Sequence, residues 1–333
     1  MPIEFGVDRK PSAKLCREIS ALVPENPFYT VEYIDAKRTS GFQPWILSLS
    51  ERGRVICGCP AFLKTGLLTR SLKIESMPMI PDTRLFWSEL QKLCAEARIS
   101  ELDVNTAASN CAGIPQLPGE LWRVSRCEFV LDLKGSDLLR GLRNSHRGRV
   151  NRSRKSGVSL RQARGPRAWR EHAHAVCSSM DRRRARGESF WAVEQTQFCE
   201  ALIHNGQGEL FQACLGGKVL SSAFIVTSRR GAYYFWAGTT KEGMALGASH
   251  FLVFEIAKTM QGRSLDVFNL GGTDLQNRGL IEFKRGFGAR ELRLEAAGFC
   301  LGSKLKRKLG RAVGLLVHDP GRLLKRLMPA LGS

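Results

Sequence analysis

The sequence predicts a mixed α/β (α+β) protein of two domains, with largely antiparallel sheets flanked by helices. Its 333 residues exceed the length at which one hydrophobic core usually stops growing, so two domains are expected. Both halves combine short strand-like runs with stretches of helical spacing. Hydrophobic residues make up 43% of the chain, a share typical of globular proteins and unlike that of extended disordered chains.

In the first half, strand patterns at 45–49 and 55–59 are separated by a charged turn, which predicts a hairpin. Residues 85–97 have helical spacing, and 101–105 read as the next strand. This half is therefore expected to be mixed α/β.

The second half repeats this order of elements. A meander of three strands, a helix and a further strand follow a first helical stretch. The expected elements are a helix at 190–203, strands at 209–214, 219–227 and 232–237, a helix at 249–260 and a strand at 265–270.

Between the halves, residues 138–170 carry many Arg and Lys residues and not one acidic residue. If Asp137 caps a helix here, Leu138, Leu142 and Val150 form only a sparse apolar edge. His146, inside this run, is expected at the surface. The predicted organisation is a first domain at 1–137, a basic helical connector at 138–170, a second domain at 171–300 and a basic amphipathic tail at 301–333.

The formal charge of +20 is strong enough to attract polyanions, such as nucleic acid or an anionic membrane surface. The alternative is an Arg-rich solvated surface without a polyanionic partner. Residues 302–331 combine basic and Leu residues, so this segment either lies on an anionic bilayer or packs against the body.

The ten cysteines are scattered without a CxxC pair, which predicts reduced core thiols and no metal site. His172 and His174 point to different sides of a helix and make a poor metal pair. The first residues have no apolar region of the signal-peptide type, and no stretch has the length of a membrane span. We therefore expect a cytoplasmic protein, with the inner face of the membrane as an alternative place of contact for the tail.

The most informative stretch is a strand, 266–270, that ends in Gly271-Gly272 and is followed by the FKRGFG element at 283–288. This arrangement resembles the Fem-type peptidoglycan bridge aminoacyltransferases and the related BioF2-like or CelD-like acetyltransferases. The basic 142–158 segment and the YYFWA strand at 233–237 are also similar to that group. The resemblance covers roughly 30–297, the first half only in general layout.

The resemblance implies two GNAT-like domains that bind an acyl donor and an amine acceptor, and an enzyme that transfers the acyl group. Attack by an amine builds negative charge on the carbonyl oxygen, and Lys284 matches the motif position for stabilising it. Phe283 and Phe287 are expected to pack around this lysine and dry its surroundings, with Gly286 and Gly288 permitting a tight exit. Asp274 and Glu282 are the nearest carboxylates for a general base, and Asp274 is taken as the second catalytic candidate. The remaining candidate substrate contacts are Asn269, Gly271, Gly272, Trp236, Arg147, Arg149 and Arg152.

The donor is a cosubstrate, aminoacyl-tRNA or acyl-CoA, and no tightly bound cofactor is expected. The 241–248 segment stands where GNAT proteins bind the CoA pyrophosphate but departs from their Q/R-x-x-G-x-G/A pattern. A glycine-containing loop before a helix capped by Ser249 still offers N–H groups to a phosphate. The candidate donor-phosphate residues are Lys241, Gly243, Gly247 and Ser249.

The Arg run slightly favours aminoacyl-tRNA, because each neutralised phosphate releases counterions. The acceptor is expected to be an amino group of a cell-envelope, sugar or small-molecule compound, including a lipid-linked one. One alternative is an acyl-CoA-dependent N-acetyltransferase of polysaccharide precursor metabolism. Another is a non-catalytic RNA- or membrane-binding protein, which leaves FKRGFG unexplained.

Overall fold

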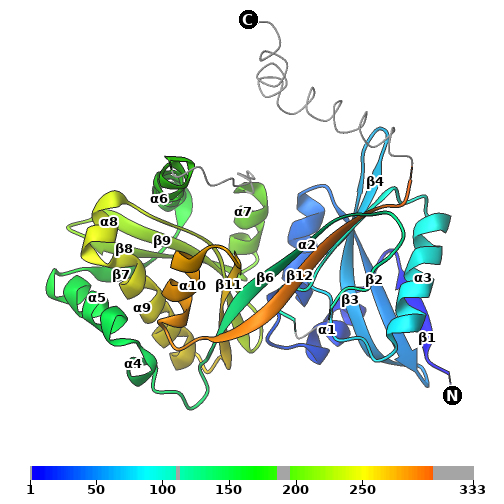
Figure 1. Ribbon diagram of the computed structural model, residues 1–333, viewed down its shortest axis with the longest axis horizontal. Helices are drawn as coiled ribbons and strands as arrows, with labels where there is room; N and C mark the ends of the chain where they lie inside the picture. Colours follow the sequence, from blue (N-terminus) through cyan, green and yellow to red (C-terminus); the bar gives the residue numbers. More distant parts are fainter. Residues whose placement is uncertain (1, 110–112, 186–195, 303–333) are drawn as a thin grey trace, which may run out of the picture.

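The computed structural model describes residues 2–109, 113–185 and 196–302. Within these ranges the centre of the protein is one continuous twelve-stranded sheet, ordered β1-β2-β3-β4-β5-β12-β6-β11-β10-β9-β8-β7 (Figure 1). Neighbouring strands are antiparallel except for the pairs β4/β5 and β10/β11. The predicted fold class is thus confirmed, although the sheets of the two halves are joined into one.

The elements of the first half occupy residues 4–132. They are β1 (Glu4–Asp8), α1 (Ala13–Leu22), the 3-10 helix η1 (Pro27–Tyr29), α2 (Val31–Thr39), β2 (Gln43–Glu51), β3 (Arg54–Thr65), β4 (Arg70–Ile74), α3 (Thr83–Glu96), β5 (Glu101–Asn105) and β6 (Glu120–Asp132). The predicted hairpin is β2 and β3, and the predicted helix and strand after it are α3 and β5.

The second half follows from residue 138. Its elements are α4 (Leu138–Gly141), α5 (Asn144–Lys155), β7 (Ser159–Ala163), α6 (Gly165–Ala185), α7 (Thr196–His204), β8 (Gly208–Leu215), β9 (Lys218–Thr227), β10 (Gly231–Thr239), α8 (Lys241–Leu246), α9 (Ala248–Gly262), β11 (Val267–Asp274), α10 (Arg278–Arg285) and β12 (Arg290–Cys300). The predicted meander is β8, β9 and β10.

The segment predicted as a basic helical connector is helical only in part. Asp137 caps the four-residue α4, as expected, but the chain leaves the helix at Leu142 and starts a second helix, α5, at Asn144. The strand β7 follows, and it pairs with β8. Residues 138–170 therefore contribute to the sheet as well as to the helices.

Two long strands, β6 and β12, connect the halves. In Figure 1 they run side by side from one half to the other, and β12 pairs with β6 on one side and with β5 on the other. The last described strand thus returns to the first half and completes its sheet. The domain boundaries at 137 and 300 stay a prediction.

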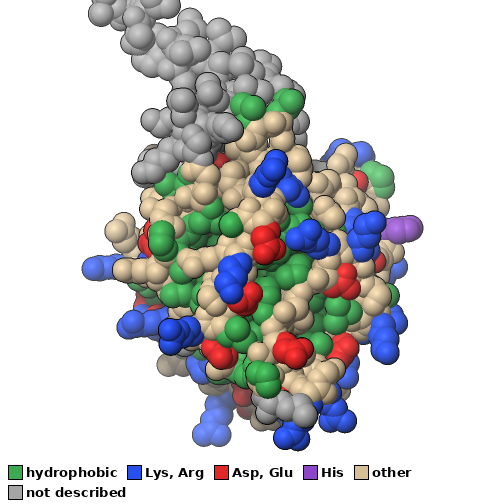
Figure 2. Space-filling model, turned by 90° about the vertical axis from the view of Figure 1, so that its right-hand side faces the viewer, with side chains coloured by type: hydrophobic (Ala, Val, Ile, Leu, Met, Phe, Trp, Pro, Cys, Tyr) green, Lys and Arg blue, Asp and Glu red, His purple; other side chains and the backbone are tan. Residues whose placement is uncertain are grey.

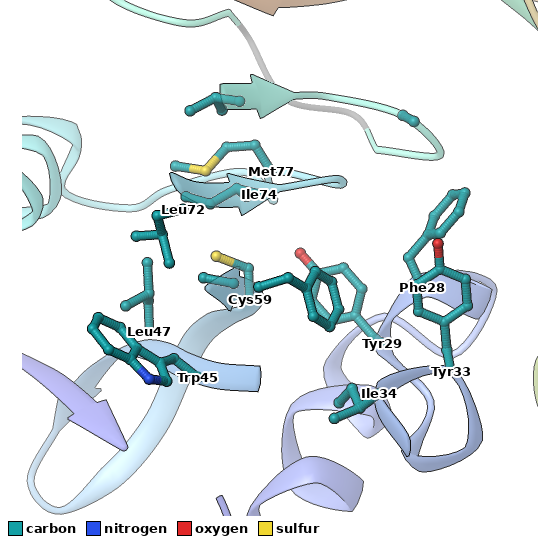
Figure 3. Packing of buried hydrophobic residues seen from close by; sticks show 14 of the residues in the cluster. Phe28, Tyr29, Tyr33, Ile34, Trp45, Leu47, Cys59, Leu72, Ile74 and Met77 are labelled. Atoms are coloured by element: carbon teal, nitrogen blue, oxygen red, sulfur yellow. The ribbon is translucent and has the colours of Figure 1, made fainter. Parts of the chain in front are cut away.

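The face of the first half that Figure 2 shows mixes basic and acidic side chains with hydrophobic ones. Beneath the surface, an aromatic core forms where α2 and η1 pack on the sheet: Tyr29 and Tyr33 lie opposite Trp45, Leu47 and Cys59 (Figure 3). A second cluster fills the space between α9 and the strands of the second half.

Of the nine cysteines among the described residues, all but Cys177 are buried, as predicted for core thiols. The described helices lack the combination of length and hydrophobicity that a membrane span needs. The predicted amphipathic tail lies, apart from residues 301 and 302, outside the described residues.

Candidate active site

The Gly271-Gly272 pair forms a bulge where three strands meet. The strands β10 and β11 pair only over Gly231–Tyr233 and Val267–Asn269, and the β6–β11 register shifts between Asn269 and Gly272. Gly271 has a φ of +75°, a conformation that favours glycine, and its N–H donates to Asn269 Oδ1 at 2.8 Å. The Asn-x-Gly-Gly sequence therefore releases backbone carbonyls from the ladder at this point.

Lys284 points into this bulge. Its side chain leaves the buried face of α10, and Nζ donates to Gly271 O at 2.7 Å and to Gly272 O at 2.9 Å. The residue is only 5% exposed, and burial lowers the pKa of its amine to about 7, while the charge of Glu128 acts in the opposite direction. The two carbonyl acceptors favour the ammonium form, so the site holds a desolvated amine that changes charge near neutral pH.

Glu128, on β6, is a buried carboxyl that the sequence did not reveal as part of the site. It is 1% exposed and accepts hydrogen bonds from Tyr233 Oη at 2.9 Å and Ala108 N at 2.8 Å. Burial raises its pKa, while hydrogen bonds from Asn269 and Tyr233 oppose that rise. Its one sequence signal is that it is a single carboxylate beside Cys127 and the apolar run 129–131.

Asp274 lies at the solvent end of β11, where its carboxylate pairs with Arg126 Nε at 3.2 Å. It is three-quarters exposed, so its environment differs from that of Glu128. Glu282 is exposed on α10 and is engaged by Arg143 and Arg285. Asp274 and Glu282 were the two carboxylates considered as a base. Asp274 lies on the strand that carries the bulge, whereas Glu282 belongs to a surface ion-pair cluster.

Phe283 and Phe287 pack against two histidines. Their rings lie 5.1 Å apart, and the ring centroids of His146 and His250 are 4.9 Å from Phe287 and Phe283 respectively. The ring over the Lys284 amine is instead Phe129, at 6.0 Å. The aromatic contact of the Lys284 amine thus comes from β6, whereas Phe283 and Phe287 pack on the two histidines.

His146 is 6% exposed, so the expectation of a surface residue was wrong. Its Nε2 lies 2.8 Å from Phe283 O, and its ring lies over Gly286, where an added Cβ would come within 2.1 Å of it. The Gly286 and Gly288 positions are both tight, as predicted, and Gly288 has a φ of +80°.

The other predicted substrate contacts lie on different elements. Trp236, half-buried after a bulge in β10, packs on Trp169 and His172 of α6. Arg149 and Arg152 are exposed on α5, whereas Arg147 donates to Leu139 O at 3.1 Å. The structure therefore brings Asn269, Gly271 and Gly272 to Lys284. It leaves Trp236 on β10 and the three arginines on α5.

The 241–248 segment is not a loop. Residues Lys241–Leu246 form α8, capped by Thr240, and α9 begins directly after Gly247. Ser249 lies within α9 and is not its cap, which corrects the expectation from sequence. Gly243 packs against Leu220 O and Gly247 against Arg149 O, so both are enclosed by backbone.

The clusters of His, Cys, Asp and Glu that metal ions need are absent from the described residues. His172 is buried with Nδ1 2.9 Å from Ser222 Oγ, and burial lowers its pKa to about 4. This histidine is therefore a neutral part of the packing between α6 and the sheet.

The part of the chain that carries Lys284 and the Gly271–Gly272 bulge is similar to a known family. Residues 140–285 match the family described as "Acetyltransferase (GNAT) domain". This part of the chain is similar to GNAT acetyltransferase domains, and the predicted enzyme class, an acyltransferase, is confirmed.

The whole fold is similar to that of several solved structures. FemX shares 12% identity, with 89% of this chain and 98% of that chain covered and a TM-score of 0.62. A tandem GNAT protein from the clavulanic acid biosynthesis pathway shares 12% identity, 91% and 100% coverage and a TM-score of 0.55. L-PGS from Bacillus licheniformis shares 11% identity, 91% and 97% coverage and a TM-score of 0.55. No curated protein matches the sequence. The resemblance to the Fem-type and BioF2-like group is confirmed at the level of fold.

Proposed function

We propose that this protein is an N-acyltransferase that moves an aminoacyl or acyl group to an amino group at the Gly271–Gly272 bulge. The observation that carries the proposal is the desolvated Lys284 amine, held by two backbone carbonyls where β10 and β11 stop pairing. Strands that part leave backbone groups and room for an extended ligand arm. The bulge lies inside the matched GNAT domain.

The reaction is an aminolysis. A neutral acceptor amine attacks the carbonyl carbon of an ester or thioester, a C–N bond forms, and the C–O or C–S bond to the donor breaks. The amine loses a proton, and the leaving oxygen or sulfur gains one. Negative charge develops on the carbonyl oxygen in between, so a fixed cation beside that oxygen lowers the barrier.

Lys284 supplies that cation in its ammonium form. Asn269 fixes the bulge, and the Gly271 and Gly272 carbonyls fix the amine. Asp274 is the candidate base on the solvent side, where an incoming amine loses its proton. Glu128 holds Tyr233 and acts on the charge of Lys284 from the buried side.

The favoured donor is aminoacyl-tRNA, used inside the cell on an amino group of a cell-envelope, sugar or small-molecule acceptor. The net charge of +20 and the exposed Arg149 and Arg152 support a donor with many phosphates. An acyl-CoA donor is the second candidate, and the acetyltransferase description of the matched family favours it. A non-catalytic binding protein fits less well, because it gives the buried Lys284 no role.

The test is transfer of a labelled acyl group from aminoacyl-tRNA or from acyl-CoA to amine acceptors, with Lys284→Met compared with the wild type. Loss of a fixed donor at a developing oxyanion costs about 10²–10³-fold in kcat. Lys284→Arg tests whether charge alone suffices, and Lys134→Met, at an exposed lysine, is the control. A folded Lys284→Met variant with full turnover would remove the catalytic role of Lys284. If the wild type transfers an acyl group neither from aminoacyl-tRNA nor from acyl-CoA, the proposed function is overturned.

A further inference from the structure

Arg126 is a cation at the rim of the bulge that holds Lys284. It lies two residues before Glu128 on β6, so both side chains are on the same face of the sheet. The pairing of β6 with β11 places Arg126 opposite Asp274. A Cβ added to Gly272 would lie 3.5 Å from Arg126 Nη2. The guanidinium therefore lies beside the residue whose carbonyl oxygen accepts from Lys284.

This cation is more accessible than Lys284. The Arg126 side chain is 35% exposed, whereas Lys284 is 5% exposed and gives two of its three N–H groups to the carbonyls of the bulge. Among the described residues, Arg126 has one ion pair, in which Nε lies 3.2 Å from Asp274 Oδ1. Its Nη1 and Nη2 donors form no hydrogen bond with any of these described residues. The outer edge of the guanidinium is therefore open to a ligand.

The Asp274 carboxylate does not cancel the charge of this edge. Asp274 is three-quarters exposed, and an ion pair with so exposed a group is weak. Arg126 and Arg183 of α6 each lower the pKa of Lys284, so both of these positive charges act at the bulge. Glu128, the acidic residue on the buried side, is 1% exposed and does not meet a ligand. An anion that approaches from the accessible side is therefore attracted.

Arg126 and Asp274 together match the two charges of an amine that also carries an anionic group. Asp274 is the candidate base, so the incoming amine lies beside its carboxylate in the proposed reaction. A carboxylate or phosphate group of the same molecule then faces the open edge of Arg126, which suits such groups because it offers two parallel N–H donors. The two side chains are in contact at 3.2 Å, so the amine and the anionic group of the acceptor must be close to each other.

We propose that Arg126 binds a carboxylate or phosphate group of the acceptor, which is therefore an amine with an anionic group close to the reacting nitrogen. This inference rests on the proposed transfer reaction and names the class of its acceptor. Amino acids and phosphorylated amino sugars both belong to this class, and matched pairs of amines distinguish them.

The test measures the binding of two matched pairs of amines by NMR titration, without a donor. Glycine and glycinamide differ in the carboxylate, and glucosamine 6-phosphate and glucosamine differ in the phosphate. The wild type is compared with Arg126→Gln and with Arg126→Lys, which keeps the charge but loses the fork of donors. The control is Arg84→Gln, which removes the charge of an exposed arginine of α3.

We expect the wild type and the control to bind one anionic amine about tenfold more tightly than its neutral partner. Arg126→Gln should bind the two members of that pair with affinities within about twofold of each other, and Arg126→Lys should keep part of the preference. Acyl transfer to the same amines is measured with each of the two donors. The ratio of kcat/KM for the anionic and the neutral amine should fall in Arg126→Gln by about as much as the ratio of affinities.

The proposal for Arg126 is overturned if the wild type prefers neither anionic amine, or if Arg126→Gln keeps the preference. Transfer to amines without such a preference would leave the proposed function standing. If the preference depends on Arg126 but no amine is acylated, the Arg126 site is supported and the result counts against the transfer reaction alone.

Discussion

Lys284 and Glu128 are buried ionisable residues whose charges act on each other. The carboxylate raises the pKa of Lys284, against the larger effect of burial. Glu128→Gln keeps the shape that Tyr233 and Ala108 contact but removes the charge. The pKa of Lys284 should then fall from about 7 to a lower value. The alkaline limb of the pH profile of kcat/KM should therefore move to lower pH.

The control for this prediction is Glu4→Gln, at an exposed position of β1, which should leave the profile in place. An alkaline limb that stays at the wild-type pH in Glu128→Gln would show that Glu128 has no electrostatic role in the reaction. A limb that is also present in Lys284→Met would show that another group titrates there.

The predictability of the site differs between these residues for a physical reason. Lys284 and the Gly271-Gly272 turn lie close in sequence, so a local motif revealed them. Glu128 contacts Tyr233, Asn269 and Ala108, which come from separate strands and a loop. Its position depends on the pairing of β6 with β11, and no local pattern encodes that pairing.

His250 gives a pH dependence of stability. Burial first, and then the charges of His146 and Arg149, lower its pKa to about 3, whereas an unfolded histidine has a pKa near 6.5. Below pH 6.5 the unfolded chain binds a proton that the folded chain does not bind. The free energy of unfolding is therefore fully retained above that pH and falls as the pH decreases toward 3.

His250→Phe keeps an aromatic ring beside His146 and Phe283 but removes the titrating group. Urea unfolding at pH 7.5 and 5 should show a smaller drop than in the wild type, by at most about 1.4 kcal/mol per pH unit. His204→Phe, at an exposed position at the end of α7, is the control and should keep the wild-type drop. An unchanged drop in His250→Phe would place the proton uptake elsewhere.

At the scale of elements, the sequence predicted where strands and helices lie better than it predicted which strands pair with each other. The hairpin β2/β3 and the meander β8–β10 are local, and turn residues mark them. The strand β12 pairs with β5 across nearly two hundred residues and with β6 across at least 160, and periodicity carries no information about such pairings. The break at Leu142 was missed because the Arg-rich segment lacks a strong apolar period on either side.

Gly286, at the end of α10, packs closely against the His146 ring of α5. The backbone of Gly286 is right-handed helical, so an alanine costs nothing in φ, but its Cβ would lie 2.1 Å from the His146 ring. Gly286→Ala should therefore destabilise the protein by about 1–3 kcal/mol, as overpacking typically does. It should also lower transfer, because α10 carries Lys284.

The matched control is Gly262→Ala at the end of α9, where an added Cβ meets no atom within 4 Å. This change should be neutral or stabilising by less than about 1 kcal/mol. Urea unfolding of both variants measures the difference. If Gly286→Ala is as stable as Gly262→Ala, the His146 ring can move away and does not anchor α10.

For the whole molecule, the charge of +20 is unevenly placed. The face of the first half in Figure 2 mixes both signs, whereas the exposed Arg149 and Arg152 belong to an α5 helix that has no acidic residue of its own. Total charge could be counted from the sequence, but only the fold shows which arginines are free. Arg143 and Arg154 pair with Glu282 and Glu255, and Arg147 is held by a backbone carbonyl.

The exposed charge of α5 separates an RNA-borne donor from acyl-CoA. Arg149→Gln/Arg152→Gln removes two exposed charges and leaves Arg147, which supports the α4–α5 turn, in place. With an aminoacyl-tRNA donor, the variant should bind tRNA more weakly, and the slope of log K against log[salt] should become shallower by about 1 for each lost phosphate contact. With an acyl-CoA donor, KM and kcat should both stay at the wild-type values, since one small ligand does not extend over α5. The control is Lys14→Gln/Arg84→Gln, which removes the same charge from two exposed residues of α1 and α3. Equal tRNA affinity and salt slope in the two variants would show that α5 contacts no RNA. The +20 charge would then be a property of the solvated surface.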